Sequence, residues 1–187
     1  MRETITEDGR LRIRRLHDES GDYELMAGWL NQPHVKHFWD PDLPPATSAY
    51  VRTTHGPDTQ PGAPTTACVI ELDGRPVGFI QFYRWVDYAD EARQLGVDFD
   101  EREWGLDVLI GEPDVVGVGV GSRAVELLCE HLEREREPSG VTLLTDITNT
   151  RAHRAYEKGG FVRVKEVLDL DTRDGERVRS YIMRRHR

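Results

Sequence analysis

The chain has 187 residues, enough for one domain with a hydrophobic core and short for two, so we expect a single domain over residues 1–187. Hydrophobic residues make up 37% and charged residues 32%, a balance typical of a globular protein and not of a disordered one. No apolar run is long enough to span a bilayer, and the polar, acidic start MRETITEDGR is not a secretory signal. We expect a cytoplasmic protein without a membrane partner.

Acidic residues dominate the charge balance, with a formal net charge of −9. They are densest between residues 87 and 107, where two arginines accompany the acids Asp87, Asp90, Glu91, Asp98, Asp100, Glu101, Glu103 and Asp107. Such a block repels nucleic acid and attracts a polycationic small molecule. The alternative is a solvated acidic loop that keeps the protein in solution.

The metal-ligating residue types show no pattern of a metal site. The two cysteines, Cys68 and Cys129, set no disulfide framework and lack metal spacing. The histidines also lack the spacing of a ligand set. We therefore expect no metal.

The first half of the chain predicts a strand, two helices and an aromatic loop. The alternation over residues 11–16 is typical of a half-exposed strand, and a helix through residue 30 follows, with Ser20 or Asp22 as its N-cap. The stretch HVKHFWDPDLPP is rich in proline, so we expect a loop near the surface. Thr47 then begins a short helix.

The second half predicts two hairpins around a crossover unit. Strands over residues 67–72 and 76–86 meet at Asp73-Gly74, and strands over residues 161–170 and 176–183 meet at Asp174-Gly175. Between the hairpins lie a strand at 104–110, a helix from residue 120, a strand at 141–146 and a helix capped by Asn149. A helical crossover makes the two central strands parallel. The predicted fold is α+β, with a mixed sheet and helices on both faces.

The stretch from Trp104 to Gly121 carries the main functional signal. Alternating glycines at a helix start direct backbone N–H groups toward one point, which suits phosphate, and Asp107 lies alone in the apolar strand just before them. A Walker A loop needs a lysine that is missing here, and the dinucleotide fingerprint G-x-G-x-x-G does not match. The pyrophosphate loop of acetyl-CoA-dependent N-acyltransferases fits the strand, loop and helix together. A glycine-rich β-to-α turn without a ligand is the remaining alternative.

A second motif carries a family resemblance. The pattern N-x-x-A-x-x-x-Y-E-K-x-G-F from Asn149 to Phe161, together with the glycine loop, resembles the GNAT N-acetyltransferase superfamily. Within it, WLNQPHVKHFW and the G-x-D-x-x-I-G-E-P run at 105–113 look like the aminoglycoside 6′-N-acetyltransferases. The resemblance covers nearly the whole chain. It implies a GNAT-like, mostly antiparallel sheet, acetyl-CoA as cosubstrate and a cationic aminoglycoside as substrate.

The resemblance also implies roles for individual residues. It places Tyr156 where it would protonate the departing thiolate, and we expect Asp107, whose basicity its apolar neighbours would raise, to take a proton from the substrate amine. The residues expected to bind acetyl-CoA are Val108, Leu109, Ile110, Val116, Gly117, Val118, Gly119, Val120, Gly121, Ser122, Arg123, Asn149 and Tyr156. Because Val116 and Val118 stand where the superfamily usually has Arg or Gln and often a basic residue, pyrophosphate binding would depend on backbone N–H groups, Ser122 and Arg123.

An acid-rich, open site is expected for a substrate with several ammonium groups. The residues expected to bind it are Trp39, Asp40, Glu103, Trp104, Asp107 and Asp146. Three of these have plain structural alternatives: Trp39 as an anchor of its loop, Trp104 as a core residue, and Asp146 as a carboxylate at a helix N-terminus.

Two other functions remain open from the sequence. One is a GNAT acyltransferase acting on a polyamine, a peptide N-terminus or the hydroxylated lysine of siderophore synthesis. The other is a non-catalytic acyl-CoA-binding module. The sequence also leaves the oligomeric state open between monomer and homodimer.

Overall fold

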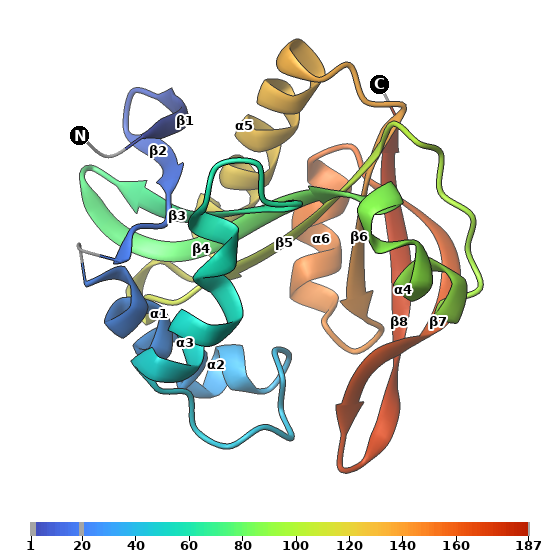
Figure 1. Ribbon diagram of the computed structural model, residues 1–187, viewed down its shortest axis with the longest axis horizontal. Coiled ribbons are helices and arrows are strands. Elements are labelled where there is room, and N and C mark those ends of the chain that lie inside the picture. The colour runs from blue at the N-terminus through green and yellow to red at the C-terminus, as the bar shows by residue number, and fades with distance from the viewer. Residues whose placement is uncertain (1–2, 19–20, 187) are drawn as a thin grey trace.

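A computed structural model describes residues 3–18 and 21–186, which form one eight-stranded sheet in the order β1-β2-β3-β4-β5-β6-β8-β7 (Figure 1). The strands are β1 (Thr4–Asp8), β2 (Leu11–Arg15), β3 (Thr65–Leu72), β4 (Arg75–Arg84), β5 (Glu103–Ile110), β6 (Gly140–Asp146), β7 (Val162–Arg173) and β8 (Glu176–His186). Every neighbouring pair is antiparallel except β5 and β6, which are parallel. The predicted fold class and the parallel central pair are confirmed.

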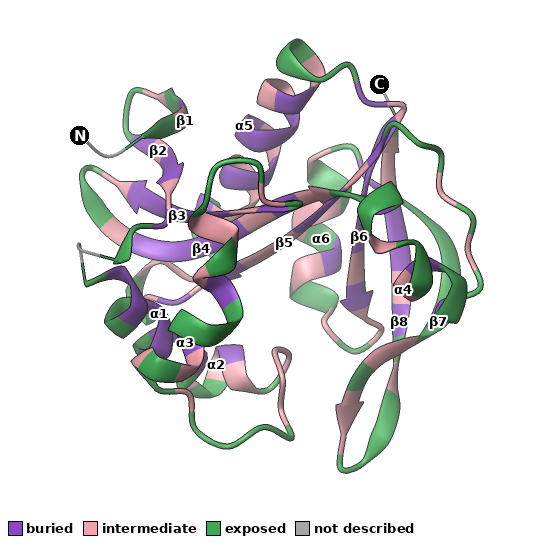
Figure 2. Ribbon diagram, viewed as in Figure 1, coloured by how far each residue is buried: buried purple, intermediate pink, exposed green. Residues whose placement is uncertain are grey.

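Helices cover both faces of the sheet. The helices are α1 (Asp22–Leu30), α2 (Pro33–Lys36), α3 (Ser48–His55), α4 (Ala89–Gln94), α5 (Val120–Glu135) and α6 (Thr150–Lys158). Alternate residues of β3 enter different cores, because successive side chains of a strand point to opposite faces. Cys68 and Ile70 pack in the core of α5, whereas Ala67 and Val69 pack in that of α1, α2 and α3. Figure 2 shows buried and intermediate residues along most of α5 and exposed residues at its C-terminal end.

Local turn and cap signals are found where the sequence predicts them. Thr47 accepts a hydrogen bond from the backbone N–H of Tyr50 at 3.2 Å, and the Asn149 side chain caps α6 in the same way. Asp73-Gly74 and Asp174-Gly175 both have positive φ angles, as two-residue hairpin turns of type I′ require. These predictions are confirmed.

Three elements differ from the sequence prediction. The edge strand β1 and the short helices α2 and α4 were not predicted, since each is too short to show a clear periodicity. Ser20 lies outside the described residues, and the N-cap of α1 is Gly21 rather than Asp22. Asp22 instead binds the buried guanidinium of Arg14, at 2.6 Å, which is a contact that no local pattern reveals.

The central parallel strands separate soon after they pair. Residues 103–105 of β5 pair with residues 140–142 of β6, and beyond Gly105 no pairing between them remains among the described residues. Figure 1 shows the two strands diverging from that point. The sheet is therefore split into two arms, and residues 106–110 of β5 have a strand partner only on the β4 side.

Candidate functional site

The separation of β5 from β6 opens a cleft of about 1080 Å³. Its walls come from both arms of the sheet: β4 and β5 on one side, and β6, α6 and β7 on the other. The glycine loop before α5 and the aromatic loop after α2 also line it. Segments far apart in the sequence thus meet around one space.

The glycine loop forms one end of the cleft. Gly117 and Gly119 have φ angles of +81° and +98°, a backbone region that side chains other than glycine rarely adopt. Gly119 is the N-cap of α5 and provides no side-chain acceptor, so the first N–H groups of this 16-residue helix have no side-chain partner. Residues 117–119 are exposed. An exposed helix start of this kind can bind an anionic phosphate.

Two of the predicted cofactor residues have other contacts. The Arg123 guanidinium lies 2.6 Å from Asp8, 2.7 Å from Glu126 and 3.3 Å from Glu130, so its charge is neutralised within the protein. It is not among the residues that line the cleft, and its observed contacts are with these three carboxylates. Val120 is buried in the core and offers only its backbone. Ser122 does line the cleft, as do Val116 and Val118.

Asp107 lines the cleft from β5. Gln81, directly opposite on β4, donates a hydrogen bond from Nε2 to Asp107 Oδ2 at 2.8 Å. Burial raises the pKa of Asp107 to about 6, although the bond from Gln81 lowers it. The carboxyl group is therefore ionised at neutral pH and more basic than an ordinary aspartate.

Tyr156 faces the same space from α6. Burial and the nearby charge of Asp107 raise the pKa of its phenol, so the O–H keeps its proton at neutral pH. Asn149, at the start of the same helix, lines the cleft while its Oδ1 accepts a hydrogen bond from the N–H of Ala152 at 3.2 Å. A proton acceptor and a proton donor thus lie on different arms of the split sheet.

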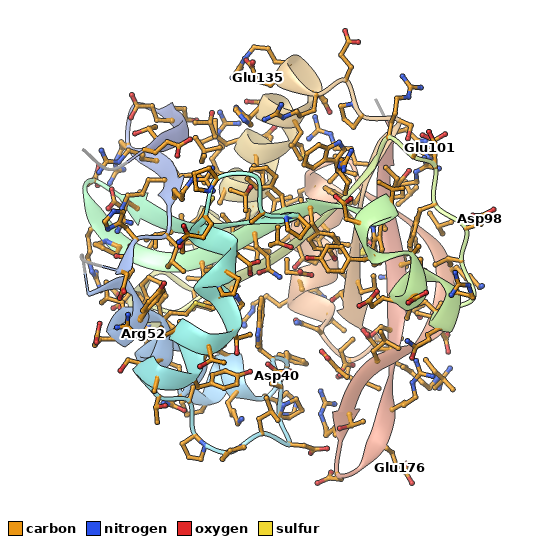
Figure 3. All side chains as sticks on the ribbon, viewed as in Figure 1. Asp40, Arg52, Asp98, Glu101, Glu135 and Glu176 are labelled. Atoms are coloured by element: carbon orange, nitrogen blue, oxygen red, sulfur yellow. The ribbon has the colours of Figure 1, made fainter. Side chains whose placement is uncertain are left out.

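The aromatic loop provides another part of the cleft lining. Trp39 is half-buried, and its ring packs edge-on against Phe79 with 6.0 Å between centroids. Asp40 beside it also lines the cleft, and burial raises its pKa. In Figure 3, Asp40 lies between the helical side and the β7–β8 hairpin.

The structure adds carboxylates that the sequence analysis missed. They are Asp58, Asp169 and Asp171, and all three line the cleft, as does Glu91 of the predicted acidic block. Asp169 and Asp171 are two residues apart on β7, so their side chains share one face, and that D-x-D spacing was the available signal. Burial, and then the charges of Asp169, Asp40 and Asp107, raise the pKa of Asp171 to about 7.

Three predicted substrate residues have partners of their own. Glu103 is buried where β5 and β6 still pair, and it binds Thr142 and, at 2.5 Å, Arg184. Trp104 packs against Phe82 with 5.9 Å between ring centroids. Neither Glu103 nor Trp104 lines the cleft. The observed contacts of Glu103 and Trp104 are therefore with neighbouring parts of the protein.

Asp146 does line the cleft, but its carboxylate is already bonded. It accepts hydrogen bonds from the backbone and side chain of Thr148, both at 2.7 Å, and from Arg173 Nη2 at 2.6 Å. Burial acts in the opposite direction, yet these bonds hold the pKa of Asp146 below its usual value. Its observed contacts organise the turn before α6.

Other kinds of site are not found in the described part of the chain. No group of three or more His, Cys, Asp or Glu residues there has the arrangement to hold a metal ion. Cys68 and Cys129 are free and buried, and burial raises the pKa of each thiol to about 12. Within the same residues, no helix has both the length and the apolar character needed to cross a membrane.

Comparison with known proteins places this geometry in a family. Residues 18–168 match the family model described as an acetyltransferase (GNAT) domain. The aminoglycoside N(6′)-acetyltransferases type 1 of Klebsiella pneumoniae and of Serratia marcescens are each 30% identical over 161 residues, which cover 86% of this chain and 77% of theirs.

Solved structures agree with that match. The complex of AAC(6′)-Ib with ribostamycin and coenzyme A superposes with a TM-score of 0.82 at 25% identity, covering 96% of this chain and 94% of that one. The complex of aminoglycoside acetyltransferase AAC(6′)-Ib with coenzyme A and kanamycin superposes with a TM-score of 0.79 at 25% identity, covering 95% of each. The chain therefore belongs to the GNAT family of acetyltransferases.

Proposed function

We propose that this protein transfers the acetyl group of acetyl-CoA to the 6′-amino group of aminoglycosides. The observation that carries the proposal is the position of Asp107, a carboxylate of raised basicity between an exposed glycine loop and a group of cleft carboxylates. The relatives named as aminoglycoside N(6′)-acetyltransferases support the same substrate class.

The glycine-loop end of the cleft fits the nucleotide part of acetyl-CoA. The N–H groups of residues 119–122 and the Ser122 hydroxyl would hold the pyrophosphate, with no arginine or lysine side chain from the loop itself. Residues 108–110 of β5, which lack a strand partner on the β6 side, would lie beside the pantetheine arm. A free backbone N–H there can donate to the thioester carbonyl oxygen. Acetyl-CoA supplies the acetyl group as a thioester.

The carboxylates that line the cleft fit a substrate with several ammonium groups. Asp40, Asp58, Glu91, Asp169 and Asp171 would bind those that do not react, and Trp39 would provide an apolar wall. An ammonium nitrogen has no lone pair, so it must lose a proton before it can attack. Asp107 would take that proton, directly or through water.

The departing sulfur needs a hydrogen-bond donor. Tyr156 O–H is protonated at neutral pH because burial and Asp107 raise its pKa, so it can donate to the sulfur as the carbon–sulfur bond breaks. Asn149 stands at the start of the same helix, where its side-chain N–H₂ can face the pantetheine while Oδ1 caps the helix.

The proposal is tested by following thiol release from acetyl-CoA with matched acceptors. Kanamycin and ribostamycin carry a 6′-amino group, and paromomycin carries a hydroxyl group at that position. We expect thiol release and a singly acetylated product with the first two and no product with paromomycin. Transfer only to spermidine or to a peptide N-terminus would overturn the substrate class. If the protein binds acetyl-CoA but releases no thiol in the presence of any amine, it is a non-catalytic acyl-CoA-binding module.

A further inference from the structure

Gln81 lies next to Asp107, the proposed base, and contacts it directly. It is the cross-strand neighbour of Asp107, on β4 opposite β5, and both side chains line the cleft. Side chains of such a pair project from the same face of a sheet, close enough for direct contact. The 2.8 Å bond from Gln81 Nε2 to Asp107 Oδ2 is that contact.

The bond determines how the Gln81 amide is turned. An ionised carboxylate only accepts hydrogen bonds, so the amide N–H₂ must face Asp107 and the amide oxygen must face away. Gln81 Oε1 is buried and has no hydrogen-bond partner among the described residues. A buried acceptor without a partner is uncommon because it costs free energy. An N–H of a bound substrate would satisfy it.

Titratable groups from several elements interact electrostatically with Asp107. They are His55 on α3, Tyr83 on β4, Tyr156 on α6, and Asp169 and Asp171 on β7. Of the groups that act on Asp107, Gln81 makes the direct hydrogen bond, while Asp169 and His55 act through charge. Gln81 is therefore the contact that fixes the orientation of the carboxylate.

We propose that Gln81 is a positioning residue, whose Nε2 holds Asp107 in place and whose Oε1 accepts a second N–H of the reacting nitrogen. This inference rests on the proposed function. A primary ammonium group gives one proton to Asp107, which becomes a neutral carboxylic acid, and the freed electron pair forms the new carbon–nitrogen bond as the carbon–sulfur bond breaks. With one N–H held by Gln81, that electron pair is directed at the thioester carbon. The surplus proton on nitrogen is then lost to water.

The test replaces Gln81 by Met, which has similar length and makes neither hydrogen bond. We expect kcat to fall by about 10-fold or more, the loss of a hydrogen bond to a charged group, with KM changed far less. The acid limb of the pH profile of kcat/KM should move to higher pH, because the Gln81 bond lowers the pKa of Asp107. The matched control is Gln94→Met at the exposed end of α4, which should leave both quantities unchanged.

A second measurement does not depend on turnover. The carboxyl carbon of Asp107 can be titrated by ¹³C NMR in the ligand-free protein, and its midpoint should be higher in Gln81→Met than in the wild type. The inference would be overturned if Gln81→Met changed neither the titration midpoint of Asp107 nor the acid limb of the pH profile of kcat/KM. It would also be overturned if the loss of activity in the variant were fully explained by a lowered Tm. If Gln81→Met does not fold, Gln81→Glu serves instead, and it should move the midpoint of Asp107 upward because two neighbouring carboxyl groups share a proton.

The two proposals fail differently. If the wild type acetylates no aminoglycoside, the proposed function is wrong, and the NMR midpoints still decide whether Gln81 holds Asp107 ionised. If the wild type is active and Gln81→Met matches it in kcat, KM and pH profile, only the inference about Gln81 is wrong.

Discussion

Asp42 accepts a hydrogen bond from the backbone N–H of Asp174 at 2.7 Å, joining the aromatic loop to the turn of the β7–β8 hairpin. The same carboxylate accepts from the N–H of Gly175 at 3.0 Å and from the Thr172 hydroxyl at 2.9 Å. These bonds hold the pKa of Asp42 below its usual value, so it remains an acceptor over the working pH range. Hydrogen bonds thus connect the aromatic loop, which lines the cleft, to the β7–β8 turn, although the two segments are more than 100 residues apart in the sequence.

Removing that tie should weaken substrate binding more than chemistry. We expect Asp42→Ala to raise KM for the aminoglycoside by roughly 3- to 10-fold and to change kcat by less than about twofold, since the loop carrying Trp39 and Asp40 loses its anchor. Asp98→Ala removes the same charge from an exposed position and serves as the control. Equal effects of the two variants would show that only net charge matters. Steady-state kinetics at saturating acetyl-CoA give both constants.

The proposed base can be tested by an isosteric change. Asp107→Asn keeps the shape and removes the basicity, so kcat should fall by roughly 100-fold or more. In the wild type, kcat/KM should rise with pH and level off above about 6, because Asp107 must be ionised to accept a proton and its pKa is about 6. The variant should lack this acid limb. A change confined to KM would mean that Asp107 binds the substrate without acting as the base.

Tyr156→Phe tests the proposed donor. The variant keeps the ring that packs near Phe161, with 6.1 Å between centroids, and loses only the O–H. We expect kcat to fall by about 10- to 100-fold with little change in the affinity for acetyl-CoA, because the bond is needed as the sulfur departs. Stopped-flow measurement of thiol release and equilibrium binding of coenzyme A separate the two. If kcat were unchanged in Tyr156→Phe, water rather than Tyr156 would deliver the proton to the departing sulfur.

The cleft carboxylates should make catalysis sensitive to salt. Charges exposed to solvent are screened beyond about 8 Å at physiological ionic strength, so kcat/KM for a polycationic substrate should fall as NaCl is raised. An aminoglycoside with fewer ammonium groups should show a shallower slope. If kcat/KM did not change with NaCl concentration for either substrate, the acidic residues would have no role in attracting the substrate.

The buried Arg14 gives a prediction for stability. Its side chain is fully buried between Asp22 and Glu71, with a contact of 2.6 Å to each. Arg14→Met would leave both carboxylates without this partner inside the protein, so the free energy of unfolding should fall by about 3–5 kcal/mol. The exposed pair of Arg10 and Asp73 offers the control, and Arg10→Met should have no measurable effect. Urea unfolding gives both values.

Patterns local in the chain gave reliable predictions of the elements. The alternation over residues 11–16, the hairpin turns at Asp73 and Asp174 and the cap at Asn149 all depend on neighbours within a few residues. Helix and strand periodicity and turn chemistry act over that range, so they can be read without a fold. The short β1 and α4 were missed because they carry too few residues to show a period.

Side-chain partners distant in the chain were not predictable in the same way. Arg123 was expected to bind phosphate, but in the structure it donates a hydrogen bond to Asp8, which is 115 residues away in the sequence. Glu103 was expected in the cleft, and Arg184 pairs with it inside the sheet. A charged side chain has the same sequence signature whether its partner is a ligand or another residue.

Sequence patterns were sufficient to predict the longer strands and helices, the glycine loop and the presence of Asp107 and Tyr156 in family motifs. Only the tertiary structure decided which carboxylates line the cleft, bringing in Asp169 and Asp171 and placing Glu103 elsewhere. The physical reason is that local backbone preferences act between neighbours along the chain. The direction and pairing of a charged side chain, in contrast, depend on the packing of β5, β6 and β7 around the point where the sheet divides.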